Sequence, residues 1–135
     1  MLDTHVFVWL MQGVERISER NKEIIRAAAT SNSLCVAAIT PWEIAMLTAK
    51  TRLALPMDVG EWLDAALGRS GIELVPLSPE IAVASNRLPG NLHGDPADRM
   101  IIASARHLNA WLITEDSAIL GYSALGYVSA LQASK

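Results

Sequence analysis

The sequence predicts an α/β fold in which a parallel sheet of four to five short strands is flanked by helices on both faces. Apolar runs of strand length alternate along the chain with segments of helical periodicity, in the order strand, helices, strand, helices, strand, helix, helix, strand. These runs lack the polar alternation of a half-exposed strand. They therefore indicate a sheet that is covered on both faces, which is typical of parallel strands.

The predicted strands are short and end next to polar residues or helix signals. They are expected at residues 1–2, 34–39, 72–77 and 110–114, with residues 127–129 as a candidate fifth strand at the edge. The helices between them begin at residues that can cap an N-terminus. They are expected over residues 4–11, 18–29, 40–52 and 58–67, and onward from residues 78 and 95.

Length and composition predict one globular domain over residues 1–135. Hydrophobic residues make up 51% of the chain and charged residues 19%, which suits a single buried core. The apolar runs are too short to span a membrane, and Asp3 and His5 interrupt any secretory signal pattern. The single cysteine, Cys35, cannot form an internal disulfide. We therefore expect a cytoplasmic protein.

The charge balance argues against broad, non-specific binding to nucleic-acid phosphates. The net charge is −3, with 11 Lys and Arg against 14 Asp and Glu, and no basic run occurs. An active site that handles phosphate through bound metal remains compatible with this balance. The four Trp and five Met fit either a well-filled core or an apolar surface for a partner or a second copy.

Four acids are expected at one edge of the sheet. Asp3, Glu43 and Asp116 follow predicted strands, and Asp98 opens the helix before the last of these strands. Right-handed connections bring such segments to the same edge of a parallel sheet. Clustered carboxylates repel one another unless a cation compensates, and Mg²⁺ and Mn²⁺ prefer oxygen ligands. Such a site could activate a water for attack on a phosphodiester.

Most of these acids also have a structural explanation. Thr40-x-x-Glu43 has the pattern of a capping box, and an acid in a first helical turn, such as Asp98, stabilises a helix N-terminus. Asp95 suits an N-cap, and Asp116 could cap a short segment over residues 117–120. Asp3 has the weakest structural explanation. Capping and metal binding are compatible, so both interpretations stay open for each acid.

Other candidate residues are weaker. Thr4, Thr40 and Thr114 could hold a metal-bound water near the acids, and Arg99 could steady a phosphate. His5, His93 and His107 show no metal-ligand spacing, and each is more often a surface or core histidine. No phosphate-cradling glycine loop and no nucleophile elbow occurs.

Four segments resemble the PIN-domain ribonucleases, and VapC-type toxins of bacterial toxin–antitoxin operons most of all. In chain order they are LDTHV (residues 2–6), AITPWEIA (38–45), GDPADRMIIA (94–103) and LITED (112–116). The resemblance spans essentially the whole chain. It implies a PIN-like three-layer fold and Mg²⁺- or Mn²⁺-dependent endonucleolytic cleavage of RNA.

The resemblance also implies roles for individual residues. Asp3, Glu43, Asp98 and Asp116 match the acidic metal-binding set of the family, and Asp95 matches an outer-sphere position. Such toxins are usually neutralised by a cognate antitoxin protein and usually form homodimers, which can enter larger toxin–antitoxin assemblies. Glu115 stands beside Asp116 where the family often has a small residue, so either carboxylate could face the site.

Two other functions stay open. A catalytically silent PIN-fold binding module would act through a partner protein or by occluding RNA, and a cleavage assay with metal distinguishes it. A phosphoaspartyl enzyme would use Asp3 as the phosphoacceptor. It would need a further acid beside Asp3 and a well-placed lysine, neither of which the sequence provides.

Overall fold

A single layer of parallel strands organises the chain. The computed structural model describes residues 1–135 and contains β1 (Leu34–Ala37), β2 (Ile72–Val75), β3 (Leu112–Thr114) and β4 (Ala130–Gln132). β1 pairs with β2 and β3 pairs with β4, both in parallel. Leu2 forms parallel bridges to Val36 and to Ile113. The order across the layer is therefore β2, β1, Leu2, β3, β4.

Leu2 joins the two halves of this layer through backbone hydrogen bonds on both sides. Its amide donates to the Cys35 carbonyl at 2.9 Å. On the other side the Ile113 amide donates to the Met1 carbonyl at 2.9 Å, and the Asp3 amide donates to the Ile113 carbonyl at 3.0 Å. The first predicted strand is thus a single-residue bridge, and it fixes the backbone of Asp3 directly.

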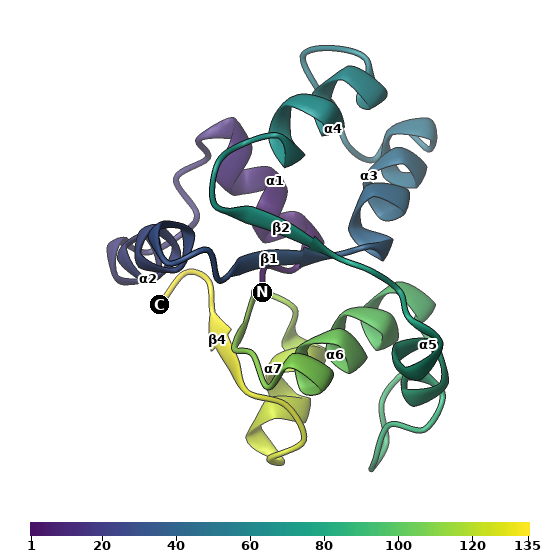
Figure 1. Cartoon of the computed structure of the whole chain (residues 1–135). Helices are drawn as coiled ribbons and strands as arrows, with labels where there is room; N and C mark the ends of the chain where they lie inside the picture. Colours follow the sequence, from purple (N-terminus) through teal and green to yellow (C-terminus); the bar gives the residue numbers. More distant parts are fainter.

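Helices cover both faces of the sheet (Figure 1). Above it in this view lie α1, α3 and α4, below it lie α5, α6 and α7, and α2 packs at one end. None of the seven helices combines the length and apolar character required to cross a bilayer. The bounds are α1 Thr4–Gln12, α2 Glu19–Thr30, α3 Ile39–Ala49, α4 Val59–Leu67, α5 Pro79–Ser85, α6 Pro96–Leu108 and α7 Ser117–Ala124.

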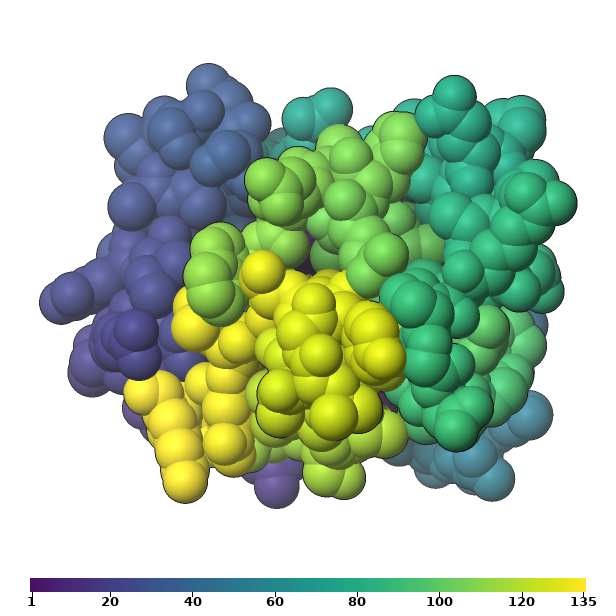
Figure 2. All heavy atoms as spheres, turned by 90° about the horizontal axis from the view of Figure 1, so that it is seen from below, coloured from purple at the N-terminus to yellow at the C-terminus, as the bar shows by residue number.

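Successive strand residues enter two different cores. Leu34 and Val36 of β1 face the core beneath α1 and α4, whereas Cys35 and Ala37 face the core beneath α5, α6 and α7. This alternation follows from the two-residue period of a strand, and it explains why no polar residues interrupt these runs. Figure 2 shows the molecule from below the sheet of Figure 1, where α5, α6 and the C-terminal residues form the surface. The predicted α/β class, with helices on both faces of a parallel sheet, is confirmed.

The start of α3 differs from the prediction. The helix begins at Ile39 after an αR cap residue, Ala38, that makes no side-chain capping bond. The predicted capping box at Thr40 and Glu43 is therefore wrong. The Thr40 hydroxyl lies 3.1 Å from the Thr4 hydroxyl, and both residues are fully buried. This contact between α1 and α3 occupies the group that would otherwise cap the helix.

The last strand also differs from the prediction. It covers Ala130–Gln132 and not residues 127–129. The side chain of Asn21 donates to the carbonyls of Gln132 and Ala133 at 2.8 and 2.9 Å, which holds the C-terminal segment against α2. This contact joins residues that are distant in the sequence, and the local pattern does not contain it.

Candidate metal centre

The acids lie at the edge of the sheet where the strands end and the next helices begin. Asp3 is the N-cap of α1, Asp116 is the N-cap of α7, and Asp95 is the N-cap of α6. Asp98 stands in the first turn of α6, and Glu43 is on α3. Parallel strands place these helix starts at a common edge, so segments from four parts of the chain meet there.

Asp3 is buried, and two hydrogen bonds hold its carboxylate in place. Its side chain is buried, with 5% of the residue exposed. Oδ1 accepts from the Thr4 amide at 2.8 Å, and Oδ2 accepts from the Thr114 hydroxyl at 2.6 Å. Burial raises the pKa of Asp3, and these two hydrogen bonds oppose the increase. Asp3 therefore has a capping role that the sequence did not reveal.

The threonines of the site hold its framework together. Thr114 Oγ1 donates to Asp3 and also accepts from the Asp116 amide at 3.0 Å, so it links two of the acids. Thr4 pairs with Thr40 at the start of α3. Each of these hydroxyls thus has a protein partner, and their predicted contact with a metal-bound water stays a prediction.

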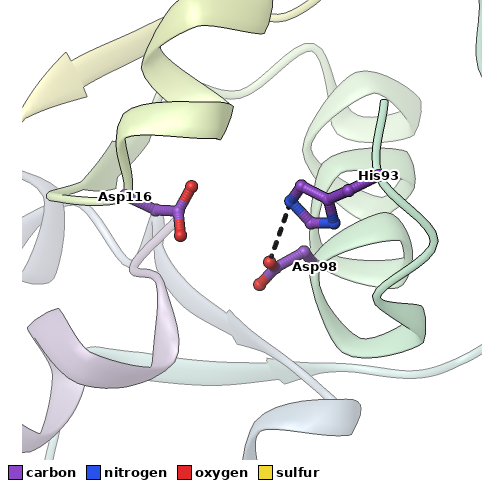
Figure 3. A group of neighbouring side chains, drawn as sticks. All are labelled: His93, Asp98 and Asp116. Carbon is purple, nitrogen blue, oxygen red and sulfur yellow. Dashed lines mark ion pairs between the residues drawn. The ribbon is translucent and has the colours of Figure 1, made fainter. Parts of the chain in front are cut away.

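Asp98 lies at the centre of the cluster. Its carboxylate belongs to two groups whose ligand atoms lie within 4.8 Å of one another, one with Glu43 and Asp95 and the other with His93 and Asp116. Figure 3 shows the second group, in which the three side chains point toward a common space from α6, from the start of α7 and from the loop before α6. One carboxylate thus connects both halves of the site.

The surroundings of Asp98 oppose its ionisation. Burial raises the pKa of Asp98 to about 8, and the neighbouring carboxylates of Asp95, Asp3, Asp116 and Glu43 contribute in the same direction. The pKa of Glu43 is also raised, mainly by burial, while the Thr4 hydroxyl opposes the increase. Such repulsion between carboxylates is the electrostatic signature of a site that a cation would stabilise.

Asp116 and its neighbour Glu115 point in different directions. The Glu115 carboxylate accepts from the Gln132 amide group at 2.7 Å and from the Ser134 backbone amide at 3.0 Å. It is therefore bound to the C-terminal segment. The Asp116 carboxylate caps α7 and faces Asp98. The geometry places Asp116, and not Glu115, in the acidic group.

Arg99 is directed away from a role in phosphate binding. Its Nε donates to the Ser85 carbonyl at 2.9 Å, and its Nη1 lies 3.3 Å from the carbonyls of Leu92 and His93. The guanidinium group therefore anchors the loop that precedes α6.

His93 enters the site although the sequence analysis set it aside. Its Nε2 lies 3.4 Å from Asp98 Oδ2. The sequence does not predict this contact between His93 and Asp98. The loop over residues 88–94 has no periodicity from which the direction of a side chain could be inferred. The turn residues around His93 do indicate a loop, and loops on a rigid scaffold often carry functional side chains. This is the one signal in the sequence that favours a functional role for His93.

The donor set fits a hard divalent cation. The candidate ligand atoms are carboxylate oxygens, with one imidazole nearby, and such oxygens suit Mg²⁺ or Mn²⁺. Burial raises the pKa of Asp98 most, and the neighbouring carboxylates add to the increase without a basic side chain that opposes it. A bound divalent cation would compensate these carboxylates.

The metal-free protein should become more stable as the pH is lowered from 8 to about 5. The folded pKa of Asp98 lies near 8, well above its ordinary value of 3.8. The folded state therefore binds more protons than the unfolded state in this window, and stability is lost as the pH rises. Urea unfolding of the protein in EDTA at several pH values measures this slope.

Asp98→Asn provides the control for this prediction. The buried Met1 ammonium group has a lowered pKa and acts in the opposite direction, so the difference between wild type and variant isolates Asp98. The variant should lose much of the increase in stability toward low pH. An identical pH slope in both proteins would contradict the assignment of the raised pKa to Asp98.

Comparisons with known proteins identify the family of the chain. A family model described as PIN domain matches residues 1–124. The chain is 34% identical over 116 residues to Ribonuclease VapC22 of Mycobacterium tuberculosis (strain ATCC 25618 / H37Rv), an alignment that covers 86% of this chain and 85% of that protein.

A solved structure shows the same fold at low sequence identity. It is the crystal structure of VapBC2 from Rickettsia felis bound to a DNA fragment from their promoter, and it matches with a TM-score of 0.69 at 20% identity. The match covers 97% of this chain and 96% of that chain. The resemblance stated from the four sequence segments is thereby confirmed. This chain belongs to the PIN domain family, and a VapC ribonuclease is among its relatives.

Proposed function

We propose that the protein is a Mg²⁺- or Mn²⁺-dependent endoribonuclease that acts as the toxin of a toxin–antitoxin pair. The observation that carries the proposal is the convergence of carboxylates on Asp98, whose pKa is raised to about 8. A site with this charge and these oxygen ligands is suited to a divalent cation and, through it, to a phosphodiester. The identity of 34% with Ribonuclease VapC22 supports RNA as the substrate.

Four residues of the chain would hold the cation. Asp3, Glu43, Asp98 and Asp116 are the proposed ligands, directly or through water, with Asp95 as an outer-sphere contributor. A bound cation supplies Lewis-acid chemistry, which favours ionisation of a water and compensates the charge that develops on the phosphate. Asp98 is the best placed to accept a hydrogen bond from the attacking water, because its carboxylate belongs to both groups of ligand atoms.

The framework around the acids fixes their orientation before substrate binds. Thr114 holds Asp3 and the Asp116 amide, and the α1–α3 contact between Thr4 and Thr40 sets the distance between the elements that carry Asp3 and Glu43. Preorganised groups of this kind need little rearrangement in the transition state. In this mechanism water is the nucleophile, and no covalent intermediate with the protein forms.

The proposal includes protein partners. A cognate antitoxin would neutralise the toxin, and the chain, as one domain over residues 1–135 located in the cytoplasm, would form a homodimer and enter larger toxin–antitoxin assemblies. The VapBC2 complex is a precedent at the level of the fold. Large apolar side chains exposed at the surface, such as Trp42 and Trp111, provide area for such contacts. With a net charge of −3, RNA selection would rely on shape or on a local patch.

Chelation should abolish RNA cleavage, and excess Mg²⁺ or Mn²⁺ should restore it. The same cations should raise the midpoint of thermal unfolding, because they bind the folded site and not the unfolded chain. Binding below pH 8 should also release protons, since Asp98 must ionise to act as a ligand. Cleavage of labelled transfer and ribosomal RNA measures the first effect, thermal unfolding with and without the cation measures the second, and calorimetry in buffers of different ionisation enthalpy measures the third.

Two outcomes of this assay would count against the proposal. Cleavage that continues in EDTA would rule out the metal-dependent mechanism. Metal binding without cleavage of any RNA tested would favour the alternative of a silent PIN-fold module that acts through a partner protein or by occluding RNA.

A further inference from the structure

His93 presents a ring nitrogen to the acidic cluster from the loop before α6. Its Nε2 lies 3.4 Å from Asp98 Oδ2, and the potential ligand atoms of His93, Asp98 and Asp116 lie within 4.8 Å of one another (Figure 3). The imidazole is about one-third exposed, with 36% of the side chain accessible, compared with 17% for Asp98. A molecule that approaches Asp98 from solvent can therefore contact His93.

The hydrogen bonding of the ring determines what Nε2 can do. The backbone amide of Asp95 donates to His93 Nδ1 at 3.2 Å. An imidazole nitrogen that accepts carries no proton, so the ring proton is on Nε2. Nε2 thus points an N–H group at the carboxylates. To act as a metal ligand, Nε2 would have to lose this proton to Nδ1, where the proton would face the Asp95 N–H.

Three contacts fix the loop that carries His93. Arg99 Nη1 lies 3.3 Å from the His93 carbonyl, and the Tyr122 hydroxyl donates to the Pro89 carbonyl at 2.6 Å. Gly90 has a φ of +69°, and a Cβ at this position would lie 2.5 Å from the ring of Tyr127. The loop therefore packs too closely for a larger residue at Gly90. These contacts hold the backbone of the loop in place before any ligand arrives.

An RNA phosphate at this site would need a hydrogen-bond donor. An RNA phosphate brings negative charge toward a cluster whose other ligand groups are carboxylates. Arg99 follows Asp98 directly in the sequence, but its guanidinium group is engaged with three backbone carbonyls. An imidazole N–H group held beside Asp98 can donate to a phosphate oxygen without competing for the cation.

We propose that His93 is a substrate-binding residue whose Nε2–H donates to a non-bridging oxygen of the RNA phosphate at the metal centre. In the free protein the same N–H group points at Asp98. The inference rests on the proposed nuclease function, and it assigns to His93 a contact with the substrate and not a place among the metal ligands.

Cleavage by His93→Ala and His93→Gln at saturating Mg²⁺ tests the contact. Loss of a hydrogen bond to a charged group should lower kcat/KM for RNA by about 10- to 100-fold in His93→Ala. His93→Gln places an amide N–H near the former Nε2 and should recover most of this loss. His107→Ala is the matched control, because His107 lies in the last turn of α6, and it should cleave like wild type.

Nitrogen NMR of the imidazole distinguishes a donor from a ligand. With ¹⁵N-labelled protein, the His93 signals should show the Nε2–H tautomer both without metal and after Mg²⁺ is added. A switch of the proton to Nδ1 on Mg²⁺ addition would identify His93 as a metal ligand and overturn the inference. If His93→Ala cleaved RNA as fast as the wild type, the inference would also be overturned. A wild-type protein that cleaves no RNA would instead refute the proposed function itself.

Discussion

Asp98→Asn should lower the rate of RNA cleavage in Mg²⁺ by about 1000-fold, which corresponds to the several kcal/mol that a metal centre contributes to charge stabilisation in the transition state. Asp98 is the carboxylate shared by both groups of candidate ligand atoms. An amide in its place keeps the shape of the side chain but removes the charge. A single-turnover cleavage assay at saturating metal measures the loss.

The same substitution should stabilise the metal-free protein at pH 8. Burial and four neighbouring carboxylates oppose the ionised form of Asp98, and a neutral amide avoids that repulsion. Activity and stability would then change in opposite directions, as expected for a residue that is retained for function. A general folding defect would lower both.

Asp64→Asn is the matched control for this experiment. Asp64 is an exposed acid on α4, and its replacement should leave cleavage and unfolding at wild-type values. If Asp98→Asn cleaved RNA as fast as the Asp64 variant, Asp98 would have no part in the metal centre.

Leu2→Ala should lower the free energy of unfolding by about 2–5 kcal/mol, the range for truncation of a fully buried leucine. Leu2 has no exposed surface and packs in the core with Val6, Phe7 and Val36. It is also the residue whose bridges join β1 and β3. Urea unfolding at pH 7 measures the change.

Leu125→Ala supplies the reference for Leu2→Ala. Leu125 is 69% exposed, so its truncation should alter stability by no more than about 0.5 kcal/mol. A loss as small in Leu2→Ala would show that the sheet does not depend on Leu2. In the expected case, cleavage by the folded fraction of Leu2→Ala should also fall, because the adjacent Asp3 amide bonds to Ile113 in the same bridge.

Most secondary structure elements could be predicted because their signals are local. Ser18, Asp58 and Ser78 cap the helices that follow them, as their sequence context indicates. The α3 start could not be predicted in this way, because the Thr40 hydroxyl makes a buried contact with Thr4, 36 residues away. The position of β4 likewise depends on Asn21 at the far end of the chain.

The location of the acids at one edge of the sheet can be predicted from the topology. The direction of their side chains cannot. Parallel strands bring Asp3 and Asp116 to one edge whatever the side chains do. The choice between Glu115 and Asp116 depends on Gln132 and Ser134, which bind Glu115 from the C-terminal segment. The direction of the His93 ring depends on the Asp95 amide. Such contacts form only in the folded chain.

The placement of the acids at helix starts has a consequence for folding without metal. Asp3 and Asp116 cap α1 and α7, and Asp95 and Asp98 occupy the start of α6. Each helix N-terminus carries a partial positive charge of about half an elementary unit. Three such ends meet at the cluster, so the backbone itself supplies part of the counter-charge. We therefore expect the protein to reach its folded state first and to acquire the cation afterwards.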